Sequence, residues 1–496
     1  MRFRILWLGL VAGLLAACGS IVQNPVTGKE ERTVLTESGE IALGRKEHQQ
    51  VLQEYAVYDN PRVQTYVNAL GQRLAKQSHR SALEWHFTVL DSPEINAFAL
   101  PGGYVYVTRG IMAFMESEAD LAGVIGHEIG HVTARHAAQR ATRQQDASLG
   151  VLAATVFGAL LDSKGAPGLG RAVSDVSQAA AAGTIASYGR EQELQADKLG
   201  AEYLARIQFS PSNMVDVIRV LKSQEQFAAE LARAQGRPAP AQNSWLASHP
   251  SNDQRLAAIS QLAAQYKGQY GDEGRARYLQ AIDGMSFGES ATQGLTRGRN
   301  FYHAGFALAV TAPAQWTVQN APDRVLLVNA ARDAALVVRL APAQLGSSHE
   351  DVIRNAFKPT SGRVERITLN GLAATQFTGT RAGAQGSPEP LVVTVVSGPG
   401  SNRFVLHWSG KDAAALQRAQ AQLREAQASF RPITATDLAD ARAWVVRTVA
   451  WPAGGFAELA RRSPLESAEQ QLRLINGVYG GGEIRPGQLV KVVERR

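Results

Sequence analysis

The sequence predicts an α+β protein of several domains. A mainly helical first domain with a small β-sheet is followed by an antiparallel-sheet α+β module and a small C-terminal module. The chain has 496 residues, of which 45% are apolar, and this is enough for two to four domains with cores of their own. Apolar residues recur at helical spacing up to about residue 265, whereas those after residue 300 form short runs typical of strands.

The N-terminus predicts an exported lipoprotein. Arg2 and Arg4 precede an apolar run that is too short to span a membrane, so 1–17 is expected to be an export signal. The run ends in Leu-Ala-Ala before Cys18, which resembles the bacterial lipobox and implies lipidation of that cysteine. Gly19 in the next position implies sorting to the outer membrane. The alternative is an ordinary signal peptide with an incidental cysteine.

The first domain is expected to alternate helices with a few short strands. After a polar tether over 18–35, one helix should begin near Thr36 and another behind Asn60-Pro61. Trp85 to Val89 alternates as a half-buried strand does, and Tyr104 to Thr108 predicts a second strand.

Residues 119–137 combine an apolar helical pattern with the clearest chemical signal in the chain. His127 and His131 are four residues apart, so on a helix both imidazoles face the same side and can bind one metal ion. Glu128 lies beside the first histidine, where its carboxylate can reach a water molecule at the metal. The stretch therefore predicts a zinc-dependent hydrolytic centre.

Two carboxylates further along the chain complete this centre. Glu193 and Asp197 share a helix face, so one can bind zinc while the other orients a histidine ligand. Between the motifs, 149–182 is rich in alanine and other apolar residues. This stretch is compatible with packed helices, with a lid over the site or with a membrane-surface segment.

Five separated motifs resemble, in their order, the HtpX/BepA-type zinc metallopeptidases of the CAAX prenyl protease superfamily. The motifs are NAFALPGG at 96–103, SE at 117–118, HEIGHVTARH at 127–136, ELQAD at 193–197 and HPS at 249–251. The resemblance runs from about Gly28 to Gln265 and implies a gluzincin metallopeptidase domain over 36–270. Without multi-pass membrane segments the chain resembles the exported, periplasmic branch, but it lacks a helical-repeat array like that of BepA.

The motifs and the resemblance together assign one Zn²⁺ per chain to three ligands: His127, His131 and Glu193. Glu128 is the expected general base, and Asp197 is expected to orient His127. His136 is a poorer third ligand because it would lie about 180° from His127 on a continuous helix. The metzincin spacing is also absent.

His249 is expected in one of two functional roles. It could occupy the fourth zinc position in a resting state, or it could stabilise the oxyanion during turnover, a role for which Tyr188 and Arg190 are further candidates. The alternative is a structural histidine at a helix start. Asn96 to Gly103 is expected to form either an edge where an extended substrate adds as a strand or a structural turn.

Beyond a connector at 271–300, short apolar runs predict an antiparallel-sheet α+β module over 301–432. The expected strands and helix are 325–328, 336–340, 364–369, 391–396, 403–408 and 413–427. This module has no cluster of histidines, cysteines or carboxylates, which favours binding or scaffolding. Residues 443–493 are similar to a LysM module at 457–460, 474–477 and 486–491, and this likeness implies peptidoglycan as a candidate partner.

The predicted function is a zinc metalloendopeptidase that acts on periplasmic or outer-membrane proteins in envelope quality control. Its expected location is the periplasmic face of the outer membrane, held by the lipid anchor. The alternatives are a non-hydrolytic, chaperone-like assembly factor and a cell-wall-tethered binding lipoprotein. The net charge of +7 is spread thinly, which gives no support to nucleic-acid binding.

Overall fold

The computed structural model describes residues 19–148, 189–234, 245, 249, 253–321, 323–383 and 386–496. The expected signal at 1–17, Cys18, the segment 149–182 and Tyr188 lie outside these residues. Within them, no helix is both long enough and apolar enough to cross a membrane. The chain divides into two compact units, the first comprising 1–285 and 446–494 and the second 286–445 and 495–496.

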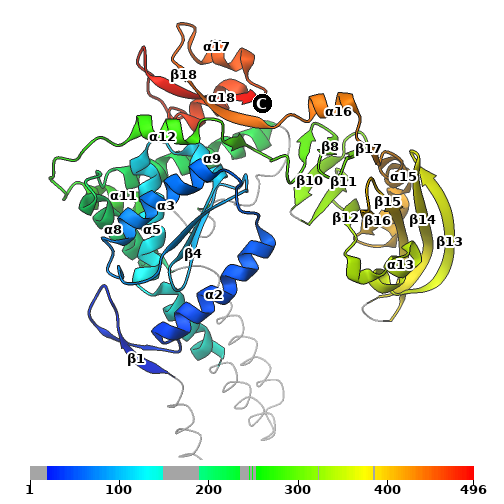
Figure 1. Ribbon diagram of the computed structural model, residues 1–496, viewed down its shortest axis with the longest axis horizontal. Helices are drawn as coiled ribbons and strands as arrows, with labels where there is room; N and C mark the ends of the chain where they lie inside the picture. Colours follow the sequence, from blue (N-terminus) through cyan, green and yellow to red (C-terminus); the bar gives the residue numbers. More distant parts are fainter. Residues whose placement is uncertain are drawn as a thin grey trace, which may run out of the picture. The chain divides into compact units, whose positions relative to one another are not determined.

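The first unit is mainly helical (Figure 1). Its helices are α2 (Glu37–Glu54), α3 (Pro61–Ala75), α4 (Arg109–Phe114), α5 (Glu118–Thr133), α8 (Arg190–Arg206), α9 (Asn213–Ala234), α11 (Asp253–Ala263), α12 (Arg275–Ile282), α17 (Gly455–Arg462) and α18 (Ala468–Ile475). Its strands are β1 (Ser20–Gln23), β2 (Glu30–Thr33), β3 (His86–Leu90), β4 (Ala97–Leu100) and β5 (Tyr104–Thr108).

The helix starts expected near Thr36 and at Pro61 are confirmed. The Thr36 side chain accepts a hydrogen bond from the Gly39 amide, and the Asn60 side chain accepts one from Val63. Each cap satisfies a backbone donor that a helix leaves without an internal partner.

A three-stranded sheet in the order β3-β5-β4 lies beside the helices. β3 runs parallel to β5, and β4 runs antiparallel to it. The tight β4–β5 connection needs glycine, because Gly103 has a φ of +100° and a Cβ atom there would lie 2.5 Å from the Glu84 carbonyl oxygen. Within the described residues β4 is an edge strand of this sheet.

All sixteen residues of α5 are buried, and Ser117 caps its N-terminus. The helix ends at Thr133, Arg135 takes a φ of +60°, and a new helical stretch covers 136–148. The continuous helix over 119–137 that the sequence suggested is therefore wrong. Arg135 is fixed in this break because it donates to the Glu40 carboxylate at 3.0 Å and to the Leu35 carbonyl oxygen at 2.8 Å.

Glycines allow α5 and α8 to pack closely. A Cβ atom on Gly130 would lie 2.9 Å from the carbonyl oxygen of Ala196, and one on Gly126 would lie 3.3 Å from the Cα of Gly200. Because of this short separation, side chains of α8 reach the polar side chains of α5.

The segment 446–494 packs on the part of the first unit formed by 1–285. Lys491 is fully buried, and its ammonium group donates to the carbonyl oxygens of Ala113 at 3.1 Å and Met115 at 2.6 Å. It also pairs with the Glu116 carboxylate at 2.8 Å. The sequence predicts 443–493 as a separate module, and no pattern in it indicates this packing.

The second unit is built on a seven-stranded antiparallel sheet in the order β10-β11-β12-β16-β15-β14-β13, with a four-stranded sheet in the order β17-β9-β8-β7. The strands are β6 (Ser286–Phe287), β7 (Leu295–Arg297), β8 (Asn300–His303), β9 (Leu308–Thr311), β10 (Thr317–Ala321), β11 (Arg324–Val328), β12 (Ala334–Leu340), β13 (Pro359–Leu369), β14 (Leu372–Ala382), β15 (Pro388–Ser397), β16 (Arg403–Gly410) and β17 (Arg431–Pro432). The helices are α13 (His349–Phe357), α14 (Ala413–Arg418), α15 (Gln420–Ala428) and α16 (Ala435–Asp440), with a 3₁₀ turn at Ala343–Leu345. β18 (Trp444–Ala450) and β19 (Leu489–Arg495) span the division between the units.

The antiparallel sheet expected after residue 300 is confirmed, and its β-rich character agrees with the predicted fold class. Two details differ from the prediction. The stretch 271–300, expected as a connector, contains α12, β6 and β7. The helix expected at 413–427 is divided at Ala419 into α14 and α15.

Candidate metal centre

Four buried side chains from three parts of the first unit converge on one point. They are His127 and His131 of α5, Glu193 of α8, and His249. Each offers one ligand atom, and these atoms all lie within 4.8 Å of one another. The sequence predicted His127, His131 and Glu193 as ligands and left the role of His249 open, and the structure brings the four side chains together.

The spacing of these atoms fits a metal ion of the size of zinc. The Nε2 atoms of His127 and His131 are 3.0 Å apart, and Nδ1 of His249 lies 3.2 Å from Nε2 of His127. Carboxylate oxygens of Glu193 lie 3.5 Å from His131 and 3.6 Å from His127. Ligand atoms about 2.0 Å from a tetrahedral zinc ion are about 3.3 Å from one another, so these distances and donor types are compatible with a metal ion such as zinc.

A buried ion pair contacts His127 at Nδ1, the ring nitrogen that does not face the cluster. Asp197 Oδ1 accepts a hydrogen bond from Nδ1 of His127 at 2.8 Å, and Arg255 binds both oxygens of Asp197 at 2.6 and 2.7 Å. Burial alone would raise the pKa of Asp197, but Arg255 and the hydrogen bonds outweigh burial and hold it at about 2. Asp197 is therefore a carboxylate at neutral pH, and it fixes the proton of His127 on Nδ1. The Nε2 atom of His127 then carries the lone pair that faces the cluster.

Arg255 also joins the two carboxylates of α8 to the His249 backbone. Its guanidinium lies 3.0 Å from Glu193 Oε2 and donates to the His249 carbonyl oxygen at 2.9 Å. The buried guanidinium of Arg255 thus positions Asp197 and Glu193 of α8 as well as the backbone of His249. No pattern in the sequence singles out Arg255, because an arginine on an amphipathic helix is usually exposed.

Glu128 lies next to the cluster and is held by two groups. Trp245 donates from its indole nitrogen to Glu128 Oε1 at 2.9 Å, and Nε2 of His249 lies 3.5 Å from the same oxygen. Burial lowers the pKa of His249, but the carboxylates of Glu128 and Glu193 outweigh burial and raise it. Trp245 is a second site residue that sequence reasoning missed.

His136 contacts the cluster from outside it. Its Nδ1 atom lies 2.9 Å from Nδ1 of His131, and its Nε2 atom lies 3.1 Å from the side-chain oxygen of Gln195. Burial lowers the pKa of His136 to about 4, so the ring is neutral at pH 7. His136 is not among the four converging donors, in agreement with the sequence prediction, although the helix geometry used for that prediction was wrong.

Of the oxyanion donors expected from the sequence, Arg190 is exposed at the N-terminus of α8.

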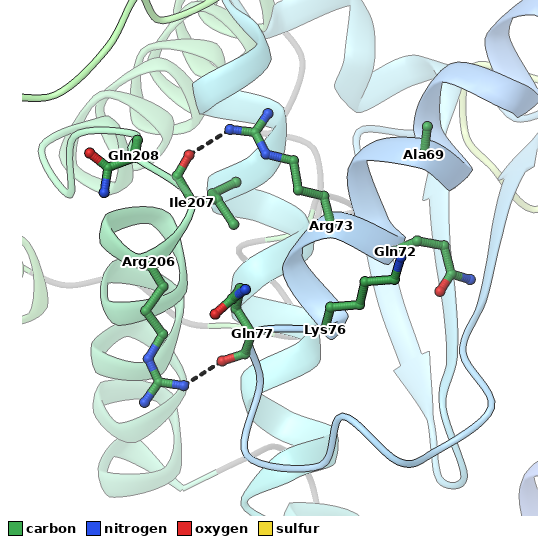
Figure 2. A pocket seen from close by; sticks show the side chains of 8 residues that line it. All are labelled: Ala69, Gln72, Arg73, Lys76, Gln77, Arg206, Ile207 and Gln208. Atoms are coloured by element: carbon green, nitrogen blue, oxygen red, sulfur yellow. Dashed lines mark hydrogen bonds between the residues drawn. The ribbon is translucent and has the colours of Figure 1, made fainter.

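A cavity of about 620 Å³ lies elsewhere in the unit, between the C-terminal ends of α3 and α8 (Figure 2). Arg73 donates to the Ile207 carbonyl oxygen at 2.5 Å, and Arg206 donates to that of Gln77. These arginines satisfy carbonyl groups at helix ends, and no member of the metal cluster lines the cavity.

A histidine pair four residues apart, a neighbouring glutamate and a glutamate from a second helix define a metallopeptidase domain. Residues 61–263 match peptidase family M48, so this part of the chain is an M48 domain. The relationship inferred from the five sequence motifs is confirmed.

Curated relatives share this domain. The beta-barrel assembly-enhancing protease of Escherichia coli (strain K12) is 30% identical over 275 residues, which cover 53% of this chain and 54% of that protein. The protein of the same name in Yersinia pestis is 29% identical over 243 residues, or 49% and 48% of the two chains. The mitochondrial metalloendopeptidase OMA1 of Bos taurus is 27% identical over 252 residues, or 49% and 46%. The chain thus spans about half the length of the curated relatives it matches.

Proposed function

We propose that the first unit is a zinc-dependent endopeptidase. The observation that carries this proposal is the buried cluster of four metal-ligand atoms next to a glutamate, in an M48 domain. His127, His131 and Glu193 are the proposed ligands of one Zn²⁺ per chain. Three protein ligands with a fourth position for water are typical of catalytic zinc sites.

The roles of the protein groups follow from their positions. A bound Zn²⁺ supplies Lewis acidity, which lowers the pKa of water and polarises the peptide carbonyl group. Glu128 accepts a proton from the attacking water and passes it to the leaving nitrogen. Asp197 keeps Nε2 of His127 unprotonated throughout, because its own pKa is about 2.

His249 belongs to the same proposal as a resting-state ligand. Its Nδ1 atom lies with the other three donors, and its Nε2 atom and Trp245 both approach the base Glu128. In this arrangement His249 takes the position that water needs, and the carboxylate that should accept a proton is engaged. Departure of His249 would free the fourth ligand position for water and would release the carboxylate of Glu128. We expect this step before turnover.

Substrates are proposed to bind as extended strands on β4. Ala99, Leu100 and Pro101 line a narrow cavity together with His131 and Val132, so the edge strand borders the metal centre. A peptide paired with β4 would satisfy the exposed backbone groups of the edge and bring its carbonyl groups to the zinc.

The cellular setting is proposed from the sequence and from the relatives. The names of the bacterial relatives indicate beta-barrel assembly, which supports periplasmic or outer-membrane proteins as substrates. Cys18 is the proposed lipid anchor on the periplasmic face of the outer membrane. Likeness to LysM modules alone supports peptidoglycan as a ligand of 443–493.

The decisive test is Glu128→Gln, which removes the base and none of the ligands. Hydrolysis of casein and of a misfolded outer-membrane protein should fall by roughly two to four orders of magnitude, while zinc content stays at one per chain. Glu191→Gln, a change at an exposed position of α8, is the matched control. Unchanged proteolysis by a zinc-loaded Glu128→Gln protein would reject Glu128 as the base. A zinc-loaded unaltered chain that hydrolyses neither substrate would favour the assembly-factor alternative.

His249→Ala separates the two roles considered for this residue. Loss of a resting ligand should raise basal hydrolysis per zinc-loaded molecule, whereas loss of an oxyanion donor should lower it by roughly a hundredfold. An unchanged rate would show that His249 is structural.

The lipid anchor is tested by Cys18→Ser. The variant should leave the outer-membrane fraction, because Cys18 is the single cysteine of the chain and therefore the proposed site of lipid attachment. Cofractionation of the variant with the unaltered protein would reject Cys18 as the anchor.

A further inference from the structure

We propose that Gln195 and His136 form a hydrogen-bond relay that fixes the tautomer of His131 and so prepares its Nε2 atom for the metal. This inference rests on the proposed metal site and adds two positioning residues to it. The relay runs from the Gln195 side-chain oxygen to His136 Nε2 at 3.1 Å, and from His136 Nδ1 to His131 Nδ1 at 2.9 Å.

The direction of each hydrogen bond follows from the donor and acceptor capacity of the groups. The amide oxygen of Gln195 can only accept, so Nε2 of His136 must carry a proton. A neutral imidazole has one N–H, and Nδ1 of His136 is therefore an acceptor. Nδ1 of His131 must then be the donor, which leaves Nε2 of His131 with its lone pair toward the cluster.

The reversed relay is incompatible with a metal ion. If the amide nitrogen of Gln195 donated to His136, the proton of His136 would move to Nδ1 and that of His131 to Nε2. The Nε2 atom of His131 lies 3.0 Å from Nε2 of His127, at the centre of the donor cluster. A proton there would occupy the space of the ion.

The two histidines of α5 thus receive equivalent support from different groups. Asp197, itself held by Arg255, accepts from His127, and His136, itself held by Gln195, accepts from His131. With both Nδ1 atoms protonated, two lone pairs face each other at 3.0 Å, and a cation between them relieves their repulsion.

The break after α5 brings His136 to this position. On an uninterrupted helix, a residue five positions further on would lie about 140° around the axis from His131. Arg135, with its φ of +60°, redirects the chain and places the two rings in an edge-on contact, with centroids 4.9 Å apart. Both rings are buried, so water does not readily replace the hydrogen bond between them.

The relay can be tested through zinc affinity rather than activity. The full chain is stripped of metal and titrated with Zn²⁺ against a competing chelator. His136→Leu, which removes the acceptor, should weaken zinc binding by about 10- to 100-fold, the range typical for groups that orient metal ligands. His136→Asn, whose amide oxygen can accept from His131, should stay much closer to the unaltered protein.

Gln195 provides a second pair of variants at a half-buried position, where folding is less at risk. Gln195→Leu should weaken zinc binding, whereas Gln195→Glu should preserve or strengthen it, because a carboxylate can only accept from His136. Thermal unfolding of the metal-free proteins separates loss of affinity from loss of folding. ¹⁵N imidazole shifts of the zinc-loaded protein should show His131 protonated at Nδ1 and metal-bound through Nε2.

The outcomes separate the relay from the site itself. If the unaltered chain binds no zinc, the proposed function fails. If it binds zinc and the leucine and acceptor-retaining variants bind equally well, or lose affinity equally, the relay is wrong, because a hydrogen-bond acceptor is then not what His131 requires.

Discussion

Glu191 and Glu193 show how strongly two neighbouring residues of one helix can differ. Glu191 is exposed, while Glu193 is 2% exposed and lies 3.1 Å from His249 Nδ1. On a helix the two side chains point about 200° apart, so only one of them can reach a buried site.

Glu193→Gln should therefore reduce the zinc content of the purified chain strongly, because an amide is a poor zinc ligand. Glu191→Gln should have no effect on zinc content. Elemental analysis of both variants is the measurement, and equal metal loss in the two would reject Glu193 as a ligand.

We expect His407 to make the second unit less stable in acid. Burial, together with Arg339 and Arg381, lowers the pKa of His407 to about 4, below the ordinary value of 6.5. The unfolded chain therefore binds a proton at a higher pH than the folded chain does. The contribution of His407 to the free energy of unfolding is complete above about pH 6.5 and is lost as the pH falls toward 4. The loss is smaller than about 3 kcal/mol, because the ring is partly exposed.

The leucine variant His407→Leu should lack this pH dependence. Hydrogen exchange in β15 and β16, corrected for the intrinsic rate at each pH, measures the effect. Exchange that accelerates equally on acidification in variant and unaltered chain would contradict the role of His407.

At this scale the sequence identifies candidate ligands better than the residues that support them. His127, His131 and Glu128 are recognisable because they are neighbours on one helix, and Glu193 because of its motif. Trp245, Arg255 and Gln195 act through contacts with residues far away in the sequence, and their types are common in other roles. His136 was visible, but its position depends on a helix break that the HEIGHVTARHA pattern does not reveal.

At the scale of elements, the packing of α5 on α8 decides whether a metal site exists at all. The two histidines and Glu193 stand on different helices, so their separation depends on the helix–helix distance. Gly130 lies between the histidines at the closest approach, where an added Cβ atom would be 2.9 Å from the Ala196 carbonyl oxygen.

Gly130→Ala should move α8 outward and weaken zinc binding, by roughly the 10-fold or more that misplaced ligands cost. Gly123→Ala, in the same helix, is the control, because its Cβ would meet the flexible Met214 side chain at 3.2 Å. The control should gain stability of up to about 1 kcal/mol from helix propensity. Equal zinc affinities in the two variants would show that the close approach is not required.

Strands were harder to predict than helices. β5 was found with its correct bounds and β3 was displaced by one residue, since alternation of apolar residues marks both. β14 was missed because its sequence, LAATQFTGTRA, is rich in threonine and alanine and has no apolar alternation. Its place in the sheet comes from pairing with β13 and β15, which is a tertiary effect.

At the scale of the whole molecule, the first unit is discontinuous in sequence, because 446–494 completes what 1–285 begins. The buried Lys491 links these two parts through its ammonium group. Burial lowers its pKa, and the Glu116 carboxylate opposes that effect. Glu116, which pairs with the ammonium group, directly precedes Ser117, the N-cap of α5.

Lys491→Met should destabilise the first unit by on the order of 3 kcal/mol, because Glu116 and two carbonyl groups lose a buried donor. Arg485→Met, an exposed change in the same segment, should be neutral. Hydrogen exchange of α4 and α5 reports the loss, and the double change with Glu116→Gln should recover part of it. If exchange in α4 and α5 is unaltered by Lys491→Met, the buried ammonium group does not stabilise this unit.

The place of Lys491 in the sequence also orders events during synthesis. The chain is synthesised from its N-terminus, so the histidine pair and Glu193 are made before the second unit, and Lys491 is made after residues 286–445 of that unit. Until then the ammonium group is absent from its contacts with Glu116 and with the carbonyl oxygens of Ala113 and Met115. The peptidase unit therefore reaches its final stability only after the second unit has been made, and a nascent or prematurely terminated chain should remain an easily degraded and poorly active enzyme.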